Sequence, residues 1–311
     1  MKLLRQTALA ALCLTFVVVV VGAYVRLSDA GLGCPDWPLC YGNPLPSQIA
    51  DGDALARAWK EMGHRYLAGT LGVLLLLLAV LAFKQKRSRG LAAAILVLVL
   101  LQATLGKWTV TMLLKPAIVT AHLLGGMTIL ALLAWYALLQ GSHAAAPQMR
   151  ALRTSAVAAL AVLGVQIALG GWVSANYAAL ACLDLPLCRG QVLPPMDFGN
   201  AFHMVRELGE TADGGLLSID ALTAIHWTHR TFALVVVAVT CWAAWKTLRV
   251  LRSLGVLLLG LLILQFSIGV ANVAFSLPLP LAAAHNAGAA ALLLALVVLN
   301  FFSFRGLRPS W

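Results

Sequence analysis

Two short stretches of the chain place ionisable side chains at the start of long apolar runs. The residues are Glu61, His64 and Arg65 in the first stretch and His226, His229 and Arg230 in the second. Imidazoles are common metal ligands, and both imidazoles and carboxylates take part in proton transfer. Because ionisable groups at the edge of hydrocarbon are costly to bury, they are expected to be functional. The two stretches therefore predict two related sites for metal or proton chemistry.

A second histidine follows in a later apolar stretch of each half of the chain. The matched residues are Gln102, Gly106 and His122 in the first half and Gln265, Gly269 and His285 in the second, with equal separations. Two imidazoles that face each other within a four-helix bundle are a standard way to ligate heme iron. Zinc is disfavoured, because a structural zinc site gathers four ligands and these histidines lie singly on separate helices. We therefore predict two heme sites, one formed by His64 with His122 and the other by His229 with His285.

Residues near the histidines each have two interpretations. Four glycines either allow a flat ring to approach the backbone or pack helices closely, and they are Gly63, Gly125, Gly126 and Gly288. Three basic residues either bind heme propionates or extend toward lipid headgroups, and they are Arg65, Arg230 and Lys107. Gln102 and Gln265 lie deeper in their spans, where hydrogen bonding between helices is the expected role.

Among the three ionisable residues compared in each stretch, one differs, where Glu61 of the first is matched by His226 of the second. Glu61 lies three residues before His64, which places both side chains on one helical face. A carboxylate beside a redox centre accepts protons or stabilises positive charge. The simpler alternative is an ion pair with Lys60 or Arg65. The difference predicts catalysis in the first half and electron storage in the second.

The elements that position these residues are predicted to be membrane-spanning helices. The chain of 311 residues is 61% hydrophobic and 11% charged, and one span needs about 20 apolar residues. Eight spans are predicted, at residues 7–25, 64–83, 91–113, 117–139, 155–173, 222–245, 254–275 and 281–304. The first is expected to be a retained helix, because it lacks the small-residue cleavage site of a signal peptide.

Charged residues predict how the spans are oriented. Basic residues cluster in loops on the side that holds both termini, whereas all 11 acidic residues fall on the opposite side. Because Lys and Arg favour cytoplasmic loops, both termini are predicted to be cytoplasmic. The net charge of +11 therefore reflects membrane topology. Membrane lipid is an expected partner and nucleic acid is not, since no basic cluster is interleaved with exposed aromatic residues.

An internal repeat divides the chain into two halves. The pattern Cys-x-Asp-x-Pro-Leu-Cys-x-Gly occurs at residues 34–42 and again at 182–190. We predict an all-α integral membrane protein with eight transmembrane helices in two pseudo-symmetric four-helix bundles. The halves, at residues 1–139 and 154–311, form a parallel repeat about an axis along the membrane normal. A cytoplasmic linker at residues 140–153 joins them.

The two cysteine pairs of this pattern fall in outer loops that face an oxidising compartment. Disulfides are predicted between Cys34 and Cys40 and between Cys182 and Cys188, chiefly as structural links, with thiol exchange as the alternative. Cys13 and Cys241 lie within spans and are expected to be small core residues. The second half has a longer outer loop, residues 191–220, which is expected to be partly helical at residues 201–209.

The combined pattern resembles the heme A synthase family of bacterial membranes and its mitochondrial relatives. The resemblance rests on Glu61-x-x-His64-Arg65, Thr228-His229-Arg230, His122 and His285, and the two cysteine loops, over essentially the whole chain. It implies an inner-membrane enzyme that oxidises the C8 methyl group of heme O to the formyl group of heme A. It also implies that His229 and His285 hold a resident heme b while His64 and His122 receive the substrate heme. On this hypothesis, water supplies the oxygen and electrons leave through heme b.

Some points stay open at the level of the sequence. His226 is an alternative to His229 as a heme b ligand, although the alignment with His64-Arg65 favours His229. The electron acceptor is not identified by the residues, and a quinone is one candidate. Homo-oligomerisation and association with the heme O synthase are also left open. Two other functions are considered. A non-catalytic membrane cytochrome b leaves the Glu61 difference unexplained, and a membrane disulfide-exchange protein leaves four matched histidines without a role.

Overall fold

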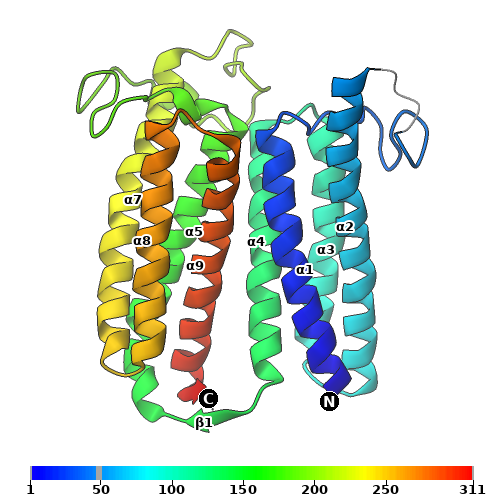
Figure 1. Cartoon of the computed structure of the whole chain (residues 1–311), viewed down its shortest axis with the longest axis vertical. Coiled ribbons are helices and arrows are strands. Elements are labelled where there is room, and N and C mark those ends of the chain that lie inside the picture. The colour runs from blue at the N-terminus through cyan, green and yellow to red at the C-terminus, as the bar shows by residue number, and fades with distance from the viewer. Residues whose placement is uncertain (1, 47–50, 310–311) are drawn as a thin grey trace.

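A computed structural model describes residues 2–46 and 51–309 of the chain. Within this part, eight helices are long and apolar enough to cross a membrane. They are α1 (Lys2–Leu27), α2 (Gly52–Lys84), α3 (Arg89–Thr111), α4 (Pro116–Leu139), α5 (Arg153–Ala175), α7 (Ile219–Leu248), α8 (Arg252–Ala274) and α9 (Leu279–Arg305). The protein is therefore an all-α multi-pass membrane protein, as predicted. Both termini lie at the same end of the helical bundle (Figure 1).

The boundaries of seven helices agree with the predicted spans to within a few residues, but α2 begins twelve residues before the predicted residue 64. The Asp51 side chain caps this early start by accepting a hydrogen bond from the Asp53 backbone N–H at 3.0 Å, as Asp commonly does at a helix N-terminus. The added residues include charged ones such as Arg57 and Lys60. A search for apolar runs does not detect them, because charged residues interrupt the apolar ones.

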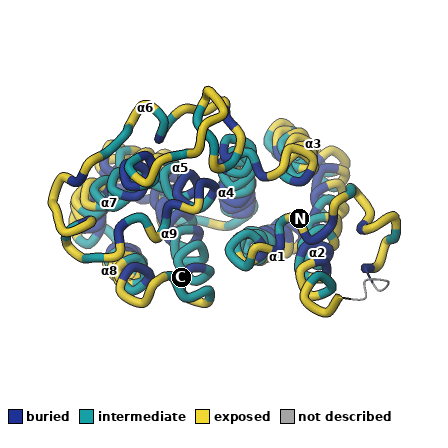
Figure 2. The backbone as a smooth tube through the Cα atoms, turned by 90° about the horizontal axis from the view of Figure 1, so that it is seen from above, coloured by how far each residue is buried: buried dark blue, intermediate teal, exposed yellow. Residues whose placement is uncertain are grey.

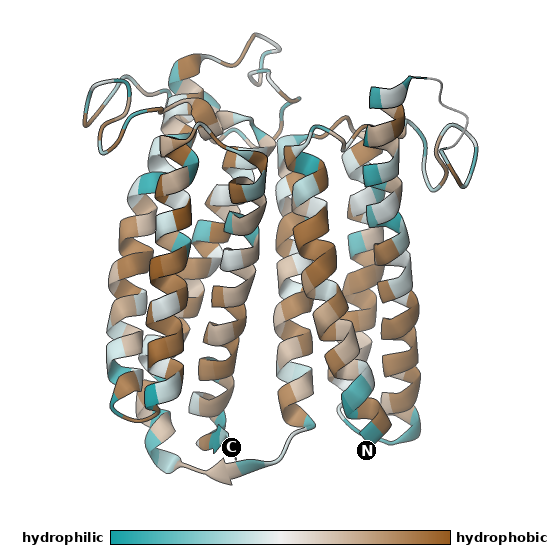
Figure 3. Ribbon diagram, in the orientation of Figure 1, coloured by the Kyte–Doolittle hydropathy of each residue, from teal (hydrophilic) through white to brown (hydrophobic). Residues whose placement is uncertain are grey.

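The buried side chains form two main clusters. One lies among α1, α2, α3 and α4 and includes Leu75 and Leu133. The other lies among α5, α7, α8 and α9 and includes Leu258 together with Leu130 of α4. Buried faces are turned toward neighbouring helices (Figure 2), and the helix shafts are apolar between more polar ends (Figure 3). Helices α4 and α9 contact each other where the two groups meet.

The linker between the two groups of helices is ordered. It contains the short strand β1 (His143–Ala145) and the 3₁₀ helix η1 (Pro147–Leu152). Strand β1 pairs antiparallel with β2 (Leu307–Pro309), so that the linker is hydrogen-bonded to the C-terminal segment.

The outer loops contain the 3₁₀ helix η2 (Ala178–Leu180) and one short helix, α6 (Phe198–Ala201). The helix expected at residues 201–209 is therefore wrong in position. Asp197 starts α6 by accepting from the backbone N–H of Asn200 at 3.1 Å, and the helix ends four residues later. Beyond it the Arg206 side chain is buried and donates to Asn176 Oδ1 at 2.5 Å, which directs the chain into the protein instead of along a helix.

Both predicted disulfides are present, with S–S distances of 2.00 Å for Cys34–Cys40 and 1.94 Å for Cys182–Cys188. The expectation for the other two cysteines is wrong, because Cys13 and Cys241 are exposed on the outside of their helices. A thiol is apolar enough to face lipid, so the occurrence of a cysteine within a span does not place it in the core.

Candidate functional site

Each of the four predicted ligand histidines packs against a glycine of a neighbouring helix. A Cβ built on that glycine would lie 2.8 Å from Nε2 of His64 (Gly22), 3.1 Å from Cε1 of His122 (Gly106), 3.0 Å from Cε1 of His229 (Gly170) and 3.1 Å from Cε1 of His285 (Gly269). These distances are shorter than ordinary contacts, so each imidazole occupies space that a larger residue would fill. Gly22 matches Gly170 in the repeat, and Gly106 matches Gly269. This match between the two halves is the sequence signal that identifies these glycines.

The four glycines that were expected to admit a flat ring or to pack helices closely have other neighbours. A Cβ at Gly125 or Gly288 would lie 2.1 Å from Oε1 of Gln102 or Gln265, and nothing lies close to Gly63. Gly126 is near Val19 at 3.5 Å. The interpretation that a flat ring approaches these glycines is therefore wrong for Gly125 and Gly288, and it stays a prediction for Gly63. Two of them make room for glutamine side chains.

Those glutamines hold the backbone next to the histidines. Gln102 Nε2 donates to the carbonyl of His122, and Gln265 Nε2 donates to the carbonyl of His285 at 3.0 Å. This is the predicted hydrogen bonding between helices. Gln166 of α5 makes the same contact with the carbonyl of His229 at 3.0 Å. The sequence comparison missed Gln166 because the matching residue of the first half is Val18.

The second pair of histidines faces one cavity. The rings of His229 and His285 have centroids 6.5 Å apart and planes inclined at 78°. A cavity of about 400 Å³ is lined by these two residues and by Gln166, Gln265, His226 and Arg230. Nδ1 of His229 is buried and has no partner among the described residues. Because an imidazole nitrogen binds a metal at about 2 Å, the space between the rings suits one metal ion with a ligand on either side.

His226 has a different environment from His229. Its side chain is buried, and its Nδ1 accepts a hydrogen bond from the backbone N–H of Cys182 at 3.3 Å. The contact fastens the second cysteine loop to α7. Since His229 faces His285 while one nitrogen of His226 is already engaged, the geometry favours His229 as the ligand.

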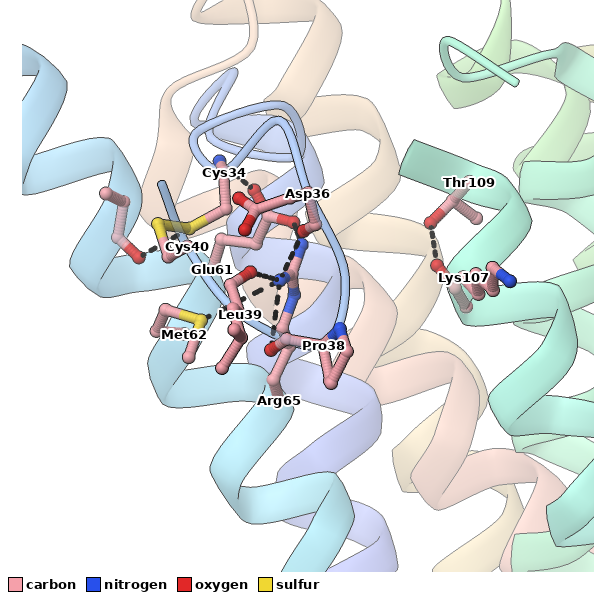
Figure 4. Close-up of polar contacts among 12 residues, drawn as sticks. Cys34, Asp36, Pro38, Leu39, Cys40, Glu61, Met62, Arg65, Lys107 and Thr109 are labelled. Carbon is pink, nitrogen blue, oxygen red and sulfur yellow. Dashed lines mark hydrogen bonds and ion pairs between the residues drawn. A yellow bond between two sulfur atoms is a disulfide. The ribbon is translucent and has the colours of Figure 1, made fainter. Parts of the chain in front are cut away.

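The first site has an ion pair at the equivalent place. Glu61 is 5% exposed, and its Oε1 lies 2.5 Å from Nη2 of Arg65. Its Oε2 accepts from the backbone N–H of Cys34 at 2.8 Å (Figure 4). The pairing with Arg65 expected as the simpler alternative is therefore present, whereas Lys60 lies 5.5 Å from the centre of the Tyr24 ring.

The ligand pair predicted for the first site is less directly opposed. His64 and His122 are near enough to interact electrostatically, and Nδ1 of His122 is buried without a partner among the described residues. The ring of His64 packs against Gly22 of α1. The two rings are thus close, with His64 turned toward α1.

The two arginines bind backbone carbonyls of the cysteine loops. Arg65 Nη1 donates to the carbonyls of Asp36 at 2.9 Å and Leu39 at 2.7 Å, and Arg230 Nη2 donates to those of Asp184 at 2.9 Å and Leu187 at 3.1 Å. Nη1 of Arg230 is buried and unpartnered among the described residues. Lys107 is exposed on α3, away from the group around Glu61 (Figure 4).

The aspartate of each cysteine loop organises a turn. Asp184 accepts from the backbone N–H groups of Arg189 and Gly190, each at 2.8 Å. The hydrogen bond from Gly190, followed by the one from Arg189, lowers the pKa of the Asp184 carboxyl below its ordinary value. Gly190 has φ of +74°, a conformation that favours glycine. The first loop repeats this arrangement with Asp36, which accepts from the N–H groups of Tyr41 and Gly42.

No three His, Cys, Asp or Glu side chains are grouped as ligands for one metal ion within residues 2–46 and 51–309. The histidines instead occur as pairs. A pair of imidazoles with a buried free nitrogen and a cavity between them matches the donor set of a six-coordinate heme, in which the macrocycle supplies the other nitrogens.

Comparisons with known proteins agree with this picture. The family model described as "COX15-CtaA: Cytochrome oxidase assembly protein" matches residues 5–297. A protein named Heme A synthase from Shewanella oneidensis is 41% identical over 309 residues, which cover 94% of this chain and 94% of that protein. A Heme A synthase from Symbiobacterium thermophilum is 32% identical over 247 residues, with 74% and 76% coverage. Another from Caulobacter vibrioides is 29% identical over 336 residues, with 95% and 94% coverage.

Proposed function

The chain belongs to the COX15-CtaA family of cytochrome oxidase assembly proteins, and from this premise we propose that it is a heme A synthase that oxidises the C8 methyl group of heme O to a formyl group. The observation that carries the proposal is the pairing of His229 and His285 across a cavity, each ring against a glycine. This geometry suits a resident heme in a chain that is 41% identical to a named Heme A synthase.

His229 and His285 would hold heme b, which supplies one-electron redox chemistry when bound. Gln166 and Gln265 fix the backbone carbonyls of these two histidines and so limit rotation of both ligand-bearing segments. The glycine contacts restrict sideways movement of the rings. This half of the protein is proposed to store and pass on electrons, to an acceptor for which a quinone is one candidate.

His64 and His122 would receive heme O, the substrate. If water supplies the oxygen, converting the methyl group to a formyl group releases four protons and four electrons, so the site needs a group that responds to positive charge. Glu61 is a buried carboxylate three residues before His64. We assign to it the balancing of charge at the reacting carbon or the acceptance of a proton, with Arg65 and the Cys34 N–H holding it in place.

The proposed location is the bacterial inner membrane, with both termini cytoplasmic and both cysteine loops on the outer face. The positions of Lys and Arg support this orientation, and the structure places both termini at one end (Figure 1). The proposed halves are residues 1–139 and 154–311, joined by the linker at 140–153. The matched contacts at Gly22 and Gly170, and at Gly106 and Gly269, support the internal repeat.

The test is expression of the full chain in a host that makes heme O and has no other source of heme A. We expect the purified protein to show a bis-imidazole heme spectrum, and the extracted hemes to include heme A or its hydroxylated precursor. A protein that binds heme but yields only unmodified hemes would instead be a membrane cytochrome b. A colourless protein would contradict both functions.

A further inference from the structure

The wall of the His229–His285 cavity carries a hydrogen-bond donor from His226. His226 lines this cavity and is 4% exposed. A neutral imidazole has one donor nitrogen and one acceptor nitrogen. Because Nδ1 accepts from the Cys182 N–H, the proton of the neutral ring is on Nε2. Since the His226 ring lines the cavity, this N–H is a donor that a ligand in the cavity can use.

A second donor lies four residues along the same helix. Arg230 lines the same cavity, and residues separated by four positions share one helical face. Its Nη2 is engaged by loop carbonyls, but its Nη1 is buried and unpartnered within the described part of the chain. A buried charged donor without a partner is costly, so this nitrogen is suited to an anionic ligand group.

The first site lacks this pair of free donors. Glu61 occupies the position that His226 has in the second site. Its Oε1 forms an ion pair with Nη2 of Arg65 at 2.5 Å. The other terminal nitrogen of Arg65 donates to the loop carbonyls. A carboxylate at this position also repels any anion that approaches, and it neutralises the arginine that would attract one.

We propose that His226 and Arg230 together bind a carboxylate of the ligand in the second site, and that Glu61 denies the first site the same contact. With the proposed function as its basis, this inference identifies the carboxylate as a propionate of the resident heme. Two charge-assisted hydrogen bonds would then hold that heme in place. The heme of the first site, held by its iron ligands without this anchor, exchanges with the membrane. One substitution between the repeats thus separates a retained heme from an exchangeable one.

The experiment measures loss of heme from the full-length protein in nanodiscs to excess apomyoglobin, followed by absorbance. Protein is loaded either with heme b or with its dimethyl ester, which lacks the carboxylates. His226→Glu recreates the first-site arrangement and is expected to accelerate heme b loss at least about tenfold, with no change for the ester. His226→Gln is the matched control, because its amide can both accept from Cys182 and donate into the cavity. It should stay within about threefold of the natural protein.

Equal rates for His226→Glu and the natural protein would overturn the proposal. So would an equal acceleration for heme b and for the ester, since that result indicates damage to the cysteine loop or the fold. The reciprocal change Glu61→His is expected to slow heme b loss from the first site about tenfold, and an unchanged rate counts against the proposal. If the natural protein held no heme, both the proposed function and this inference would fail. Retention by the natural protein together with unaffected variants would refute only this inference.

Discussion

Replacing Gly170 with alanine tests whether the glycine contacts position the proposed heme ligands. A Cβ at this residue would lie 3.0 Å from Cε1 of His229, whereas ordinary van der Waals contact begins at 3.4 Å. The ring must therefore move by about 0.4 Å in a close-packed interior. Its backbone carbonyl is held by Gln166 at 3.0 Å, so the ring cannot follow by a simple shift of α7. We expect the orientation of His229 toward His285 to change.

Gly164 on the same helix provides a matched control, because nothing lies within 4 Å of its Cβ position. Alanine in a helix is more favourable than glycine by about 1 kcal/mol, and both variants receive this gain. Only Gly170→Ala also incurs the cost of overpacking, about 1–3 kcal/mol. The two variants should therefore differ in unfolding free energy by about 1–3 kcal/mol.

The assay combines thermal unfolding in detergent with the optical spectrum of the reduced, heme-loaded protein. Gly170→Ala should melt at a lower temperature than Gly164→Ala and show a reduced bis-imidazole signal, while Gly164→Ala keeps the natural spectrum. Identical melting temperatures and identical spectra for the two variants would refute the argument that the Gly170 contact orients His229.

Three further changes have defined outcomes. Glu61→Gln should abolish most heme A production while heme binding persists, as extracted hemes would show; undiminished heme A would remove its role. His285→Ala should lose the bis-imidazole spectrum of the resident heme while the protein remains in the membrane, and a normal spectrum would defeat the ligand assignment. The pKa of Asp184 is lowered chiefly by the Gly190 N–H, so its stabilisation of the loop is present above the ordinary value of 3.8 and is lost as pH falls through the lowered one. In hydrogen exchange, the Gly190 amide should exchange faster once the Asp184 carboxyl is protonated. Asp184→Asn is the control, and a ratio of the two Gly190 exchange rates that stays constant across this pH range would contradict the assignment.

The sequence predicted the number of spans and the cysteine pairing because both depend on local patterns. An apolar run of sufficient length has few alternatives to a membrane helix. The repeated Cys-x-Asp-x-Pro-Leu-Cys-x-Gly pattern brings each cysteine pair close in the chain, and both disulfides formed. The repeat also identified the two matched glutamines, Gln102 and Gln265, whose hydrogen bonds the structure shows.

The facing of each helix could not be predicted from the same patterns. In a membrane, side chains toward lipid and toward neighbouring helices are both apolar, so periodicity does not separate them. This is why Cys13 was expected in the core but is exposed, and why Gly288 was expected beside a ring but lies against Gln265. The glycines that do contact the histidines come from neighbouring helices, so only the repeat, which places Gly106 and Gly269 at equal separations from His122 and His285, points to them.

The length of α2 determines where the first site meets water. With 33 residues at about 1.5 Å each, the helix is much longer than a hydrocarbon layer of about 30 Å. Counting from Lys84, about 20 residues of helix fill that layer, which brings His64 and Arg65 to its far boundary. Glu61 then stands at the level of the lipid headgroups. On the proposed function, the water consumed at this site and the protons released there have only the headgroup layer to cross, and neither needs a channel through the lipid hydrocarbon.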